Sequence, residues 1–508
     1  MLSLFEANNA EEWDYKGEGA ANVIVLYCGT LPNFVGKVLR VKKAPQKFLK
    51  DNHLRNKAPV LSVEEQSIWS DWQEVVAANS KEILAQAYVQ HAIGPLLGSE
   101  YVDPGILIRV SEGFLEALEQ KISNKRPAWR IEAAKIDLQS DFALIMSDHS
   151  LFLRGPNDTA PCISIEIKPK CGFLPSSRFI SAENHIKRLV SRFAMHQHLK
   201  FSQKEISCIS KYSPLDLFSE SRDRIHRAIE GLFETPQNNL RIFWNGSLVF
   251  GGLGGYAEQG LCNGPTINSL ARELEDTLKS VILCQSGERV AIFKDLVTET
   301  LLRTRILSHL LAVQKMDLYD IEGAIHAYFN VIQVPCHICP HSVSEAGNLN
   351  EAENIEINPD EPIEKDMQEN NSDLHFPSSI TESLSEEHME KHTQGNFSYL
   401  HSSKNECSHL HSLSIEESRR IVRDFLLATT AKDCSLMLTF QPMAHDFTEV
   451  NALDRNDVIY MSSTKQAFHY KATFIDLDLK RLKKMNHYYD LDQNIVNCYT
   501  RTREGTTL

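Results

Sequence analysis

Regularly spaced apolar residues predict the first strands and helices of the chain. Residues 15–42 predict a hairpin, in which a Gly-rich turn leads into NVIVLY and a second strand follows in FVGKVLRVKK. Residues 63–92 have the amphipathic spacing of a helix. Residues 126–175 predict strands in WRIEAAKID, FALIMSDHSLF and CISIEIK.

The second part of the chain alternates between helical and strand patterns. Helical spacing dominates residues 179–235 and 267–330, with one strand between them in RIFWNGSLVFGG. A further helix over residues 415–431 precedes two strands, CSLMLTF and HYKATFIDLDL. A β-rich first part and a larger mixed part predict an α+β protein of two lobes with a cleft between them.

The pattern predicts four parts along the chain. Residues 1–170 form an N-terminal β-rich lobe with the Gly-rich hairpin, and residues 171–342 form the first part of a C-terminal α/β lobe. Residues 343–405 predict a disordered acidic insert, because they are polar, rich in Asn and Ser, and without a hydrophobic period. Residues 406–508 complete the C-terminal lobe.

The net charge of −14 over 508 residues comes mainly from this insert. Residues 343–399 hold 14 Asp or Glu and only two Lys, so the rest of the chain is close to neutral. A near-neutral body can carry a strongly basic cleft, and the overall charge therefore does not exclude an anionic substrate. The sequence contains no extended basic stripe with aromatic residues, so we expect no nucleic-acid partner.

Nothing in the sequence predicts export or membrane insertion. The start, MLSLFEANNAEEW, meets acidic residues too early for a signal peptide, and no run of about 18 apolar residues predicts a membrane span. The 11 cysteines are an odd number spread along the chain, and we expect mostly reduced thiols. We expect a monomer in the cytoplasm, the nucleus or both.

The stretch EIKPKCGFLP, residues 166–175, ends an apolar strand with three charged side chains. Lys and Glu are rarely buried without partners, so Glu166, Lys168 and Lys170 predict either a local salt bridge or a charged ligand. A strand period of two places all three on one face.

The turn GEGAAN, residues 17–22, lets backbone N–H groups approach a phosphate, although most such turns are only turns. It is neither a Walker A loop nor a Rossmann fingerprint. A Gly-rich hairpin over nucleotide phosphates is typical of kinase-like folds. The next strand offers Lys37 and Arg40 on opposite faces, and one of them must face the cleft.

In FIDLDLK, residues 474–480, the strand period places Asp476, Asp478 and Lys480 on one face. Two carboxylates there suit Mg²⁺, which shares oxygen ligands with substrate phosphates; a solvated strand face is the alternative. Asp433 lies at a helix-to-strand junction, where it either accepts a hydroxyl proton or belongs to a helix cap or surface turn.

Basic residues recur beside these segments. They are Arg130, Lys168, Lys170, Lys200, Arg241, Lys480, Lys483 and Lys484. A single lysine is usually just solvated, but several at strand ends together favour a polyanionic small molecule.

Cys336 and Cys339 in CHIC form a C-x₂-C pair, and His326 precedes them in the sequence. Such a pair holds tetrahedral Zn²⁺ well. A redox dithiol is the weaker alternative, because no helix opens at the motif in a βαβ context. The spacing leaves the fourth ligand open among His337, His341, His375, His388, His392, His401, His409 and His411.

Together these segments resemble the inositol-pentakisphosphate 2-kinase family in its plant form. The resemblance rests on EIKPKCGFLP, with GEGAAN upstream, TPQNNLRIF in the middle, and TAKDCS and FIDLDLK downstream, and it covers residues 11–495 apart from the insert. It implies a two-lobed fold distantly like protein kinases. It also implies transfer of the γ-phosphoryl group of ATP to the 2-hydroxyl of inositol 1,3,4,5,6-pentakisphosphate, giving the hexakisphosphate (phytate).

The resemblance also implies roles for single residues. The nucleotide residues are Gly19, Ala20, Ala21, Asn22, Arg40, Asp148, Glu166 and Arg241. The substrate phosphates are held by Arg130, Lys168, Lys170, Lys200, Asn238, Lys480, Lys484 and Tyr488. The catalytic residues are Lys168, Asp433 at the 2-hydroxyl, and Asp476, which also holds Mg²⁺. The zinc ligands are His326, Cys336, Cys339 and His411.

The chain departs from the family pattern at Pro45, where Arg is usual, and Lys42, Lys43 or Lys47 could substitute for it. Retention of Asp433, Asp476 and Lys168 favours an active kinase over two alternatives. One alternative is a sensor that binds inositol phosphates without turnover, and the other is a zinc-anchored scaffold whose acidic insert binds a partner.

Overall fold

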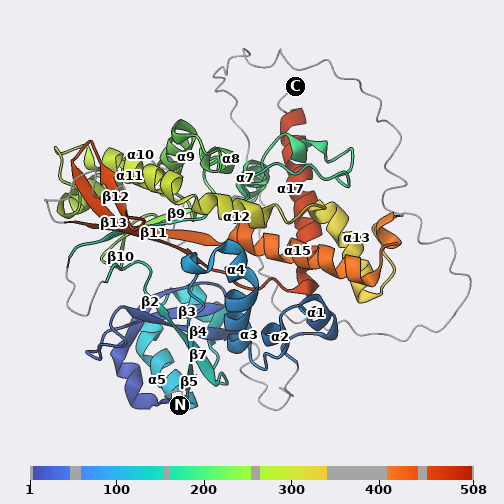
Figure 1. Cartoon of the computed structure of the whole chain (residues 1–508), viewed down its shortest axis with the longest axis horizontal. Coiled ribbons are helices and arrows are strands. Elements are labelled where there is room, and N and C mark those ends of the chain that lie inside the picture. Colours follow the sequence, from blue (N-terminus) through green and yellow to red (C-terminus); the bar gives the residue numbers. More distant parts are fainter. Residues whose placement is uncertain are drawn as a thin grey trace, which may run out of the picture.

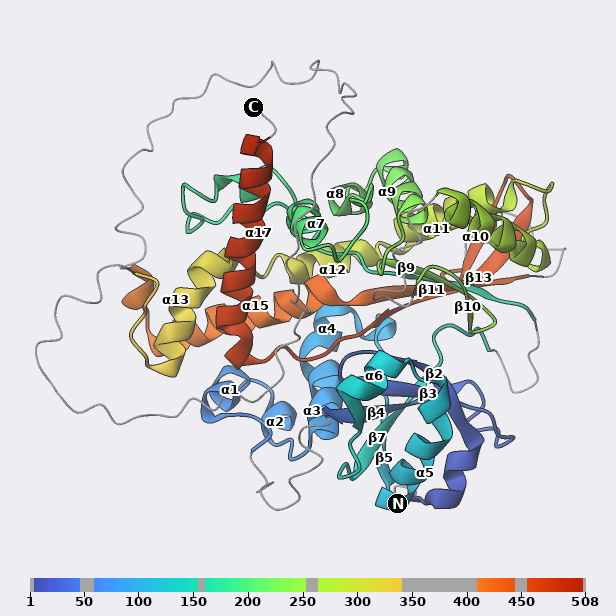
Figure 2. The ribbon, with the colours of Figure 1, turned by 180° about the vertical axis from the view of Figure 1, so that it is seen from behind.

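The computed structural model describes residues 4–45, 59–153, 160–252, 264–339, 409–443 and 455–505. Within these ranges the strands form two sheets, of seven and six strands, covered by helices (Figures 1 and 2). This mixed architecture confirms the predicted α+β class, whereas the likeness to protein kinases stays a prediction. The predicted insert, residues 343–405, lies outside the described residues.

The first sheet has the strand order β1-β5-β7-β4-β3-β2, with β6 beside β4. Neighbouring strands are antiparallel, apart from the parallel pair of β1 and β5. The strands are β1 (Leu4–Phe5), β2 (Trp13–Glu18), β3 (Asn22–Tyr27), β4 (Lys37–Pro45), β5 (Ile106–Val110), β6 (Ala134–Ile136) and β7 (Phe142–Ser147).

One face of the first sheet packs against helix α5 (Glu112–Ile122). Val25 of β3 and Leu39 of β4 are fully buried in this core with Leu115 of α5. Because side chains alternate along a strand, Arg40, next to Leu39, faces the opposite side. The predicted hairpin of residues 15–42 is therefore confirmed, and it is Arg40 that faces away from the α5 core.

The second sheet has the strand order β10-β9-β8-β11-β13-β12, in which every neighbouring pair is antiparallel. The strands are β8 (Ile163–Ile167), β9 (Leu240–Trp244), β10 (Ser247–Phe250), β11 (Ser435–Pro442), β12 (Val458–Met461) and β13 (Gln466–Ile475). All of β8 and nearly all of β11 are buried. Their burial fits central strands that are covered on both faces.

The helices surround both sheets (Figures 1 and 2). They are α1 (Val63–Ile68), α2 (Gln73–Val76), α3 (Lys81–Ala87), α4 (Gly94–Leu97), α5 (Glu112–Ile122), α6 (Ala128–Ala133), α7 (Arg192–Ser202), α8 (Pro214–Leu217), α9 (Arg222–Glu234), α10 (Gly264–Thr277), α11 (Arg289–Thr304), α12 (Ile306–Gln314), α13 (Asp320–Ile332), α15 (Ile415–Asp433) and α17 (Met485–Gly505). In the described part of the chain, no helix has the length and apolarity needed to cross a bilayer.

Helix α15 sets one boundary of the site described below. Ser414 and Glu417 form a capping box at its first turn, which satisfies backbone N–H groups that otherwise lack partners. The helix then continues to Asp433, and β11 begins two residues later at Ser435. A helix over residues 415–431 was predicted, and the structure confirms it.

Helix α4 lies between the two sheets, and α3 lies beside the first sheet (Figures 1 and 2). Helix α3 packs against β5 and β7 of the first sheet, and α4 packs against α12. The sheets are thus joined by packed helices as well as by the chain between β7 and β8.

Two local predictions are wrong, and three strands were not predicted. The segment WRIEAAKID, residues 129–137, lies mostly in helix α6 (Ala128–Ala133), and only residues 134–136 form a strand. RIFWNGSLVFGG is two strands, β9 and β10, because Asn245 and Gly246 have φ of 46° and 80° and form a tight turn. Strands β1, β5 and β12 were not predicted.

Candidate active site

Three segments meet at one end of the second sheet. In the register of the sheet, Ile167 at the end of β8 lies opposite Leu436 near the start of β11. Ile475 at the end of β13 lies opposite Ser435. The residues that follow β8, precede β11 and follow β13 are therefore neighbours, although they are far apart in sequence.

The predicted strand faces are wrong for both charged segments. Strand β8 ends at Ile167 and β13 ends at Ile475, so Lys168, Lys170, Asp476 and Lys480 all lie beyond the strands. Lys170 and Asp476 have left-handed backbone conformations, with φ of 60° and 62°. Such conformations in residues other than Gly cost on the order of 1–3 kcal/mol and are concentrated at functional sites.

These segments nevertheless bring the predicted charges together. The Nζ of Lys168 lies 3.4 Å from Oδ2 of Asp476, which also accepts a hydrogen bond from the Ser435 hydroxyl at 3.5 Å. Lys480 donates to Oδ2 of Asp433. Burial disfavours the charged form of Lys168. The carboxylates of Asp476, Glu166 and Asp433 outweigh burial and raise the pKa of this lysine.

Lys170 lies among like charges. Burial is the main cause that lowers the pKa of Lys170 to about 8, and the carboxylate of Asp433 only partly opposes it. Lys168, Lys200 of α7 and Lys480 each lower this pKa further. Four lysines from three distant segments thus form one cationic cluster, which we call the lysine cluster: Lys168, Lys170, Lys200 and Lys480. Three of them also act on Asp433, whereas Lys200 acts on Lys170.

Asp433 is ionised at neutral pH in this setting. Burial alone would raise its pKa, but Lys480, Lys170 and Lys168 outweigh burial and hold the pKa of Asp433 below its usual value. A carboxylate held in place by a lysine can accept a hydrogen bond from a substrate hydroxyl.

The predicted nucleotide residues lie on both sheets. Arg40 of β4 donates to Oδ1 of Asp478 at 2.5 Å, so it links the first sheet to the segment that follows β13. Glu166 and Arg241 lie opposite each other on β8 and β9, with Nη1 of Arg241 3.4 Å from Oε2 of Glu166. Asp148 is buried just after β7, where its Oδ2 accepts from Lys16 at 2.6 Å.

The Gly-rich turn lies between β2 and β3. The N–H of Gly19 donates to the backbone oxygen of Asn22 at 3.0 Å, which closes the turn. Gly19, Ala20 and Ala21 are exposed, whereas Asn22 is buried. A Cβ added at Gly19 would meet no atom within 4 Å, so the space beside the turn is open.

The remaining predicted substrate residues lie around the lysine cluster or on the first sheet. Asn238 is exposed in the turn before β9, next to Asn239, whose oxygen accepts from the Lys168 N–H at 2.9 Å. Lys484 is exposed just before α17, and Tyr488 in the first turn of α17 packs against Phe425 of α15. Arg130 on α6 stacks on the ring of Trp129 at 4.0 Å.

Of the lysines that could substitute at Pro45, Lys43 is already engaged. It is bound to Glu18 at 2.6 Å, and both side chains are almost wholly buried. Glu18 also binds Arg126 at 3.0 Å, which completes an internal ion network. Lys47 lies outside the described residues.

The four predicted zinc ligands come together. The Nδ1 of His326 lies 3.4 Å from the sulfur of Cys336 and 3.7 Å from that of Cys339, and Nε2 of His411 lies 3.2 Å from the sulfur of Cys339. All four ligand atoms lie within 4.8 Å of one another. With Zn–S near 2.3 Å and Zn–N near 2.0–2.1 Å, a tetrahedral site has a sulfur-to-nitrogen separation of about 3.6 Å. The cluster therefore has the size and donor set of a tetrahedral metal site.

A second group of buried acids is charge-paired inside the protein. Asp320, Glu322 and Asp492 surround the ammonium of Lys187, which lies 3.0 Å from Glu322 and 2.7 Å from Asp492. The lysine occupies the position that a cation would take, so this group offers no open metal site.

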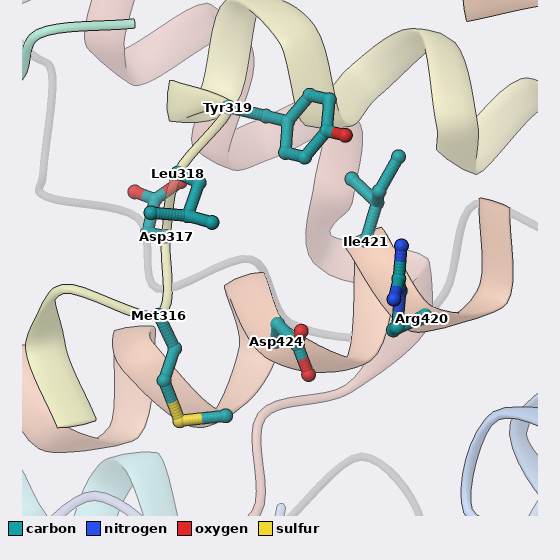
Figure 3. A pocket seen from close by; sticks show the side chains of 7 residues that line it. All are labelled: Met316, Asp317, Leu318, Tyr319, Arg420, Ile421 and Asp424. Carbon is teal, nitrogen blue, oxygen red and sulfur yellow. The ribbon is translucent and has the colours of Figure 1, made fainter. Parts of the chain in front are cut away.

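Figure 3 shows a hollow of about 180 Å³ between α15 and the segment before α13. It is lined by Met316, Asp317, Leu318, Tyr319, Arg420, Ile421 and Asp424. Two carboxylates and one arginine give it no excess of positive charge, and no member of the lysine cluster lines it. The hollow is therefore unsuited to a polyanion.

Two contacts of the site were missed from the sequence. Lys16 of β2 donates to Asp148, to the Ser150 hydroxyl at 2.9 Å and to the oxygen of Gly246 at 3.2 Å. Gln314, at the end of α12, binds the backbone of Lys170 and of Ala431. Neither residue lies in a motif, and their partners are distant in sequence, so no local signal could reveal them.

Lysines around one carboxylate, with a second carboxylate beside Lys168, suit a protein that binds a phosphate-rich ligand. The sequence model of the family described as inositol-pentakisphosphate 2-kinase matches residues 15–494. The chain therefore belongs to the inositol-pentakisphosphate 2-kinase family, which confirms the resemblance and the prediction that it is a kinase.

Relatives named inositol-pentakisphosphate 2-kinase are similar over nearly the whole chain. The Arabidopsis thaliana protein is 39% identical over 508 residues, covering 99% of this chain and 97% of the relative. The Oryza sativa subsp. japonica protein is 42% identical over 507 residues, with the same coverage of 99% and 97%. The Danio rerio protein is 29% identical, covering 97% of this chain and 94% of the relative. The higher identity to the plant proteins agrees with the plant form of the resemblance.

Proposed function

We propose that the protein transfers the γ-phosphoryl group of ATP to the 2-hydroxyl of inositol 1,3,4,5,6-pentakisphosphate, giving inositol hexakisphosphate. The observation that carries the proposal is the lysine cluster beside Asp433 at the end of the second sheet. The names of the family and of its members supply the substrate.

The charge of the substrate explains the lysine cluster. At about 1.5–2 negative charges per phosphate, a pentakisphosphate carries roughly ten negative charges. Lys170, whose pKa is lowered mainly by burial and further by the neighbouring lysines, gains a counter-charge when such a ligand binds. Lys168, Lys170, Lys200 and Lys480 form the centre of the substrate site, and Asn238, Lys484, Tyr488 and Arg130 are its further contacts.

The two carboxylates have different tasks. Asp433 accepts the proton of the 2-hydroxyl or holds that hydroxyl in line with the donor phosphate. Asp476 is largely exposed, with a carboxylate oxygen next to Lys168, and its donor type fits Mg²⁺. Mg²⁺ bound at Asp476 would neutralise charge on the phosphates of ATP.

Lys168 stabilises the phosphoryl group during transfer. Its ammonium lies next to Asp476 and its charged form is favoured by the carboxylates around it. Phosphoryl transfer needs little covalent help, so positioning and charge neutralisation are the main contributions of these residues.

The nucleotide binds between the Gly-rich turn of the first sheet and the start of the second sheet. Gly19, Ala20, Ala21 and Asn22 offer the open turn, and Arg40 offers a cation that Asp478 orients. Asp148, Glu166 and Arg241 form the inner end of this site, near the chain that connects β7 with β8.

We further infer that His326, Cys336, Cys339 and His411 hold Zn²⁺ in a structural role. Support comes from the spacing of the ligand atoms, which matches a tetrahedral site closed by four protein ligands. Bound zinc would fasten the C-x₂-C segment after α13 to the start of α15, the helix that ends at Asp433.

The test is a transfer assay with the full chain. Purified protein is incubated with Mg·ATP and inositol 1,3,4,5,6-pentakisphosphate, and the products are resolved by anion exchange. Hexakisphosphate with an equal amount of ADP supports the proposal, and Asp433→Asn should abolish the product while Asp490→Asn, on the exposed side of α17, should not. Tight binding of the substrate without product would favour the sensor, and neither product nor binding would overturn the proposal.

A further inference from the structure

Lys42 lies on the same face of the first sheet as Arg40. On β3 and β4 the register pairs Ile24 with Arg40 and Asn22 with Lys42. Side chains of directly paired residues lie on the same face, and the α5 core takes the alternate residues, such as Leu39 and Val41. We call the opposite side, with Asn22, Ile24, Arg40 and Lys42, the Arg40 face.

This face points toward the segment after β13. Arg40 binds Asp478 there, and the charge of Asp478 also acts on Lys42. Lys42 also lies beside the Gly-rich turn, because the N–H of the next residue, Lys43, donates to the oxygen of Ala21 at 2.9 Å. Lys42 thus lies next to the segment after β13 and next to the Gly-rich turn, the two segments that the proposed function places at the transferred phosphate.

The ammonium of Lys42 has no counter-ion among the residues that the structure describes. Asp478 is bound to Arg40, and Glu82, the other acid near Lys42, accepts a hydrogen bond from the Ser140 hydroxyl at 3.0 Å. Burial lowers the pKa of Lys42, and the positive charge of Arg40 lowers it further. A desolvated cation beside a second cation favours an anion supplied from outside the chain.

Asn22 gives an independent sign that a ligand belongs here. The residue is 7% exposed, and within the described residues its Oδ1 has no hydrogen-bond partner. A buried polar atom without a partner is costly, so a ligand or a ligand-bound water is expected to satisfy it. Asn22 and Lys42 are direct neighbours across the two strands.

We propose that Lys42 is a further phosphate-binding residue of the transfer site, acting beside Arg40 under the Gly-rich turn. The inference rests on the proposed function, because it assumes that phosphoryl transfer takes place on this face. The phosphate belongs either to the nucleotide or to the inositol substrate, and the shared chemistry is a phosphate group that meets an ammonium.

The test compares Lys42→Met with Lys42→Arg and with a matched control, Lys81→Met. Lys81 is exposed at the start of α3, and its charge also acts on Lys42, so the control removes a nearby positive charge outside the Arg40 face. Each variant is titrated by calorimetry with Mg²⁺ and a non-hydrolysable ATP analogue, and separately with inositol pentakisphosphate. Turnover is measured in parallel, and circular dichroism checks the fold.

Lys42→Met should weaken the binding of one ligand by about 10- to 100-fold, the usual effect of losing one charge-assisted hydrogen bond. The ligand that loses affinity identifies the source of the phosphate. Lys42→Arg and Lys81→Met should stay within about threefold of the wild-type affinity.

The proposal is overturned if Lys42→Met and Lys81→Met have equal affinities and equal turnover. It is also overturned if Lys42→Met loses affinity equally for both ligands and has a lower melting temperature. If Lys42→Met does not fold, Lys42→Gln replaces it, because it keeps the length and a polar end. If the wild-type protein transfers no phosphate, the proposed function fails, whereas the two titrations still decide the role of Lys42.

Discussion

The side-chain amide of Gln314 ties the backbone of Lys170 to the end of the helix that carries Asp433. Its Nε2 donates to the oxygen of Lys170 at 2.8 Å and to that of Ala431 at 3.1 Å, and its Oε1 accepts from the N–H of Gly172 at 2.9 Å. Gln314 is completely buried, so water has no access to these groups. The relative position of Lys170 and Asp433 therefore depends on one amide.

Gln314→Leu should lower kcat of the folded protein, in addition to lowering its stability. The substitution leaves two backbone oxygens and one N–H without their partner, at a cost of about 1–3 kcal/mol for each unsatisfied group. We expect a lower melting temperature and, at temperatures where the variant is folded, a loss of kcat of about tenfold or more, because the strained turn at Lys170 moves relative to Asp433.

The matched control is Gln466→Leu, which also removes a buried amide with two backbone partners, Leu283 and Val281. It should lower the melting temperature and leave kcat of the folded protein unchanged. Equal kcat in the two variants would show that Gln314 has only a structural role.

Lys168→Ala should remove activity and leave the protein folded. Its partner Asp476 is more than half exposed, so the ion pair between them is screened by water and contributes little to stability. Loss of one charge-stabilising donor costs about 10²- to 10³-fold in kcat. Turnover and thermal melting measured together test this, with the exposed Lys211→Ala as the control. An unchanged turnover rate would refute the role given to Lys168.

Binding of the inositol phosphate should take up a proton near pH 8. Burial is the main cause that lowers the pKa of Lys170 to about 8 in the free protein, with the nearby lysines adding to it. Phosphates favour the charged amine, so binding raises this pKa and is strongest below pH 8, and it weakens as the pH rises above 8. Without ligand, the same shift makes the folded state more stable as the pH rises from about 8 to 10.5, because the unfolded chain then binds more protons.

Calorimetry at pH 8 in two buffers with different ionisation enthalpies measures this uptake. Lys170→Arg is the control, because a guanidinium stays charged throughout this range. The difference in proton uptake between wild type and Lys170→Arg isolates Lys170 from the titration of the substrate phosphates. The assignment is wrong if the two proteins take up the same number of protons.

The fold could be predicted where neighbouring residues decide the structure. The run NVIVLY and the alternation in FVGKVLRVKK give β3 and β4, and the spacing of apolar residues after Ser414 gives α15. The position of Asp433 followed from this, because a helix that ends directly before a strand leaves its last residue at the edge of the sheet. Residues of the candidate site could be named through the resemblance, which rests on these same segments.

The ends of β8 and β13 could not be predicted, because burial continues beyond the hydrogen-bonded strands. Leu477 is buried in the core of the second sheet although it lies outside any strand, so FIDLDLK keeps an alternating pattern in irregular chain. The role of Gln314 gave no signal either, because an amide at the end of an apolar helix finds its partners on backbone atoms more than a hundred residues away.

Cys336→Ser should release zinc and lower the melting temperature. The sulfur of Cys336 is buried and lies in the cluster with His326, Cys339 and His411, which joins the chain after α13 to the chain before α15. Binding of a metal to the folded state stabilises it, and each kcal/mol lost corresponds to about 2–4 °C in a domain of 150–250 residues. Metal content by atomic emission and thermal melting give the two readouts. Cys284→Ser, a partly exposed thiol outside the cluster, should leave both unchanged. Full zinc content and an equal melting temperature in Cys336→Ser would exclude the metal site.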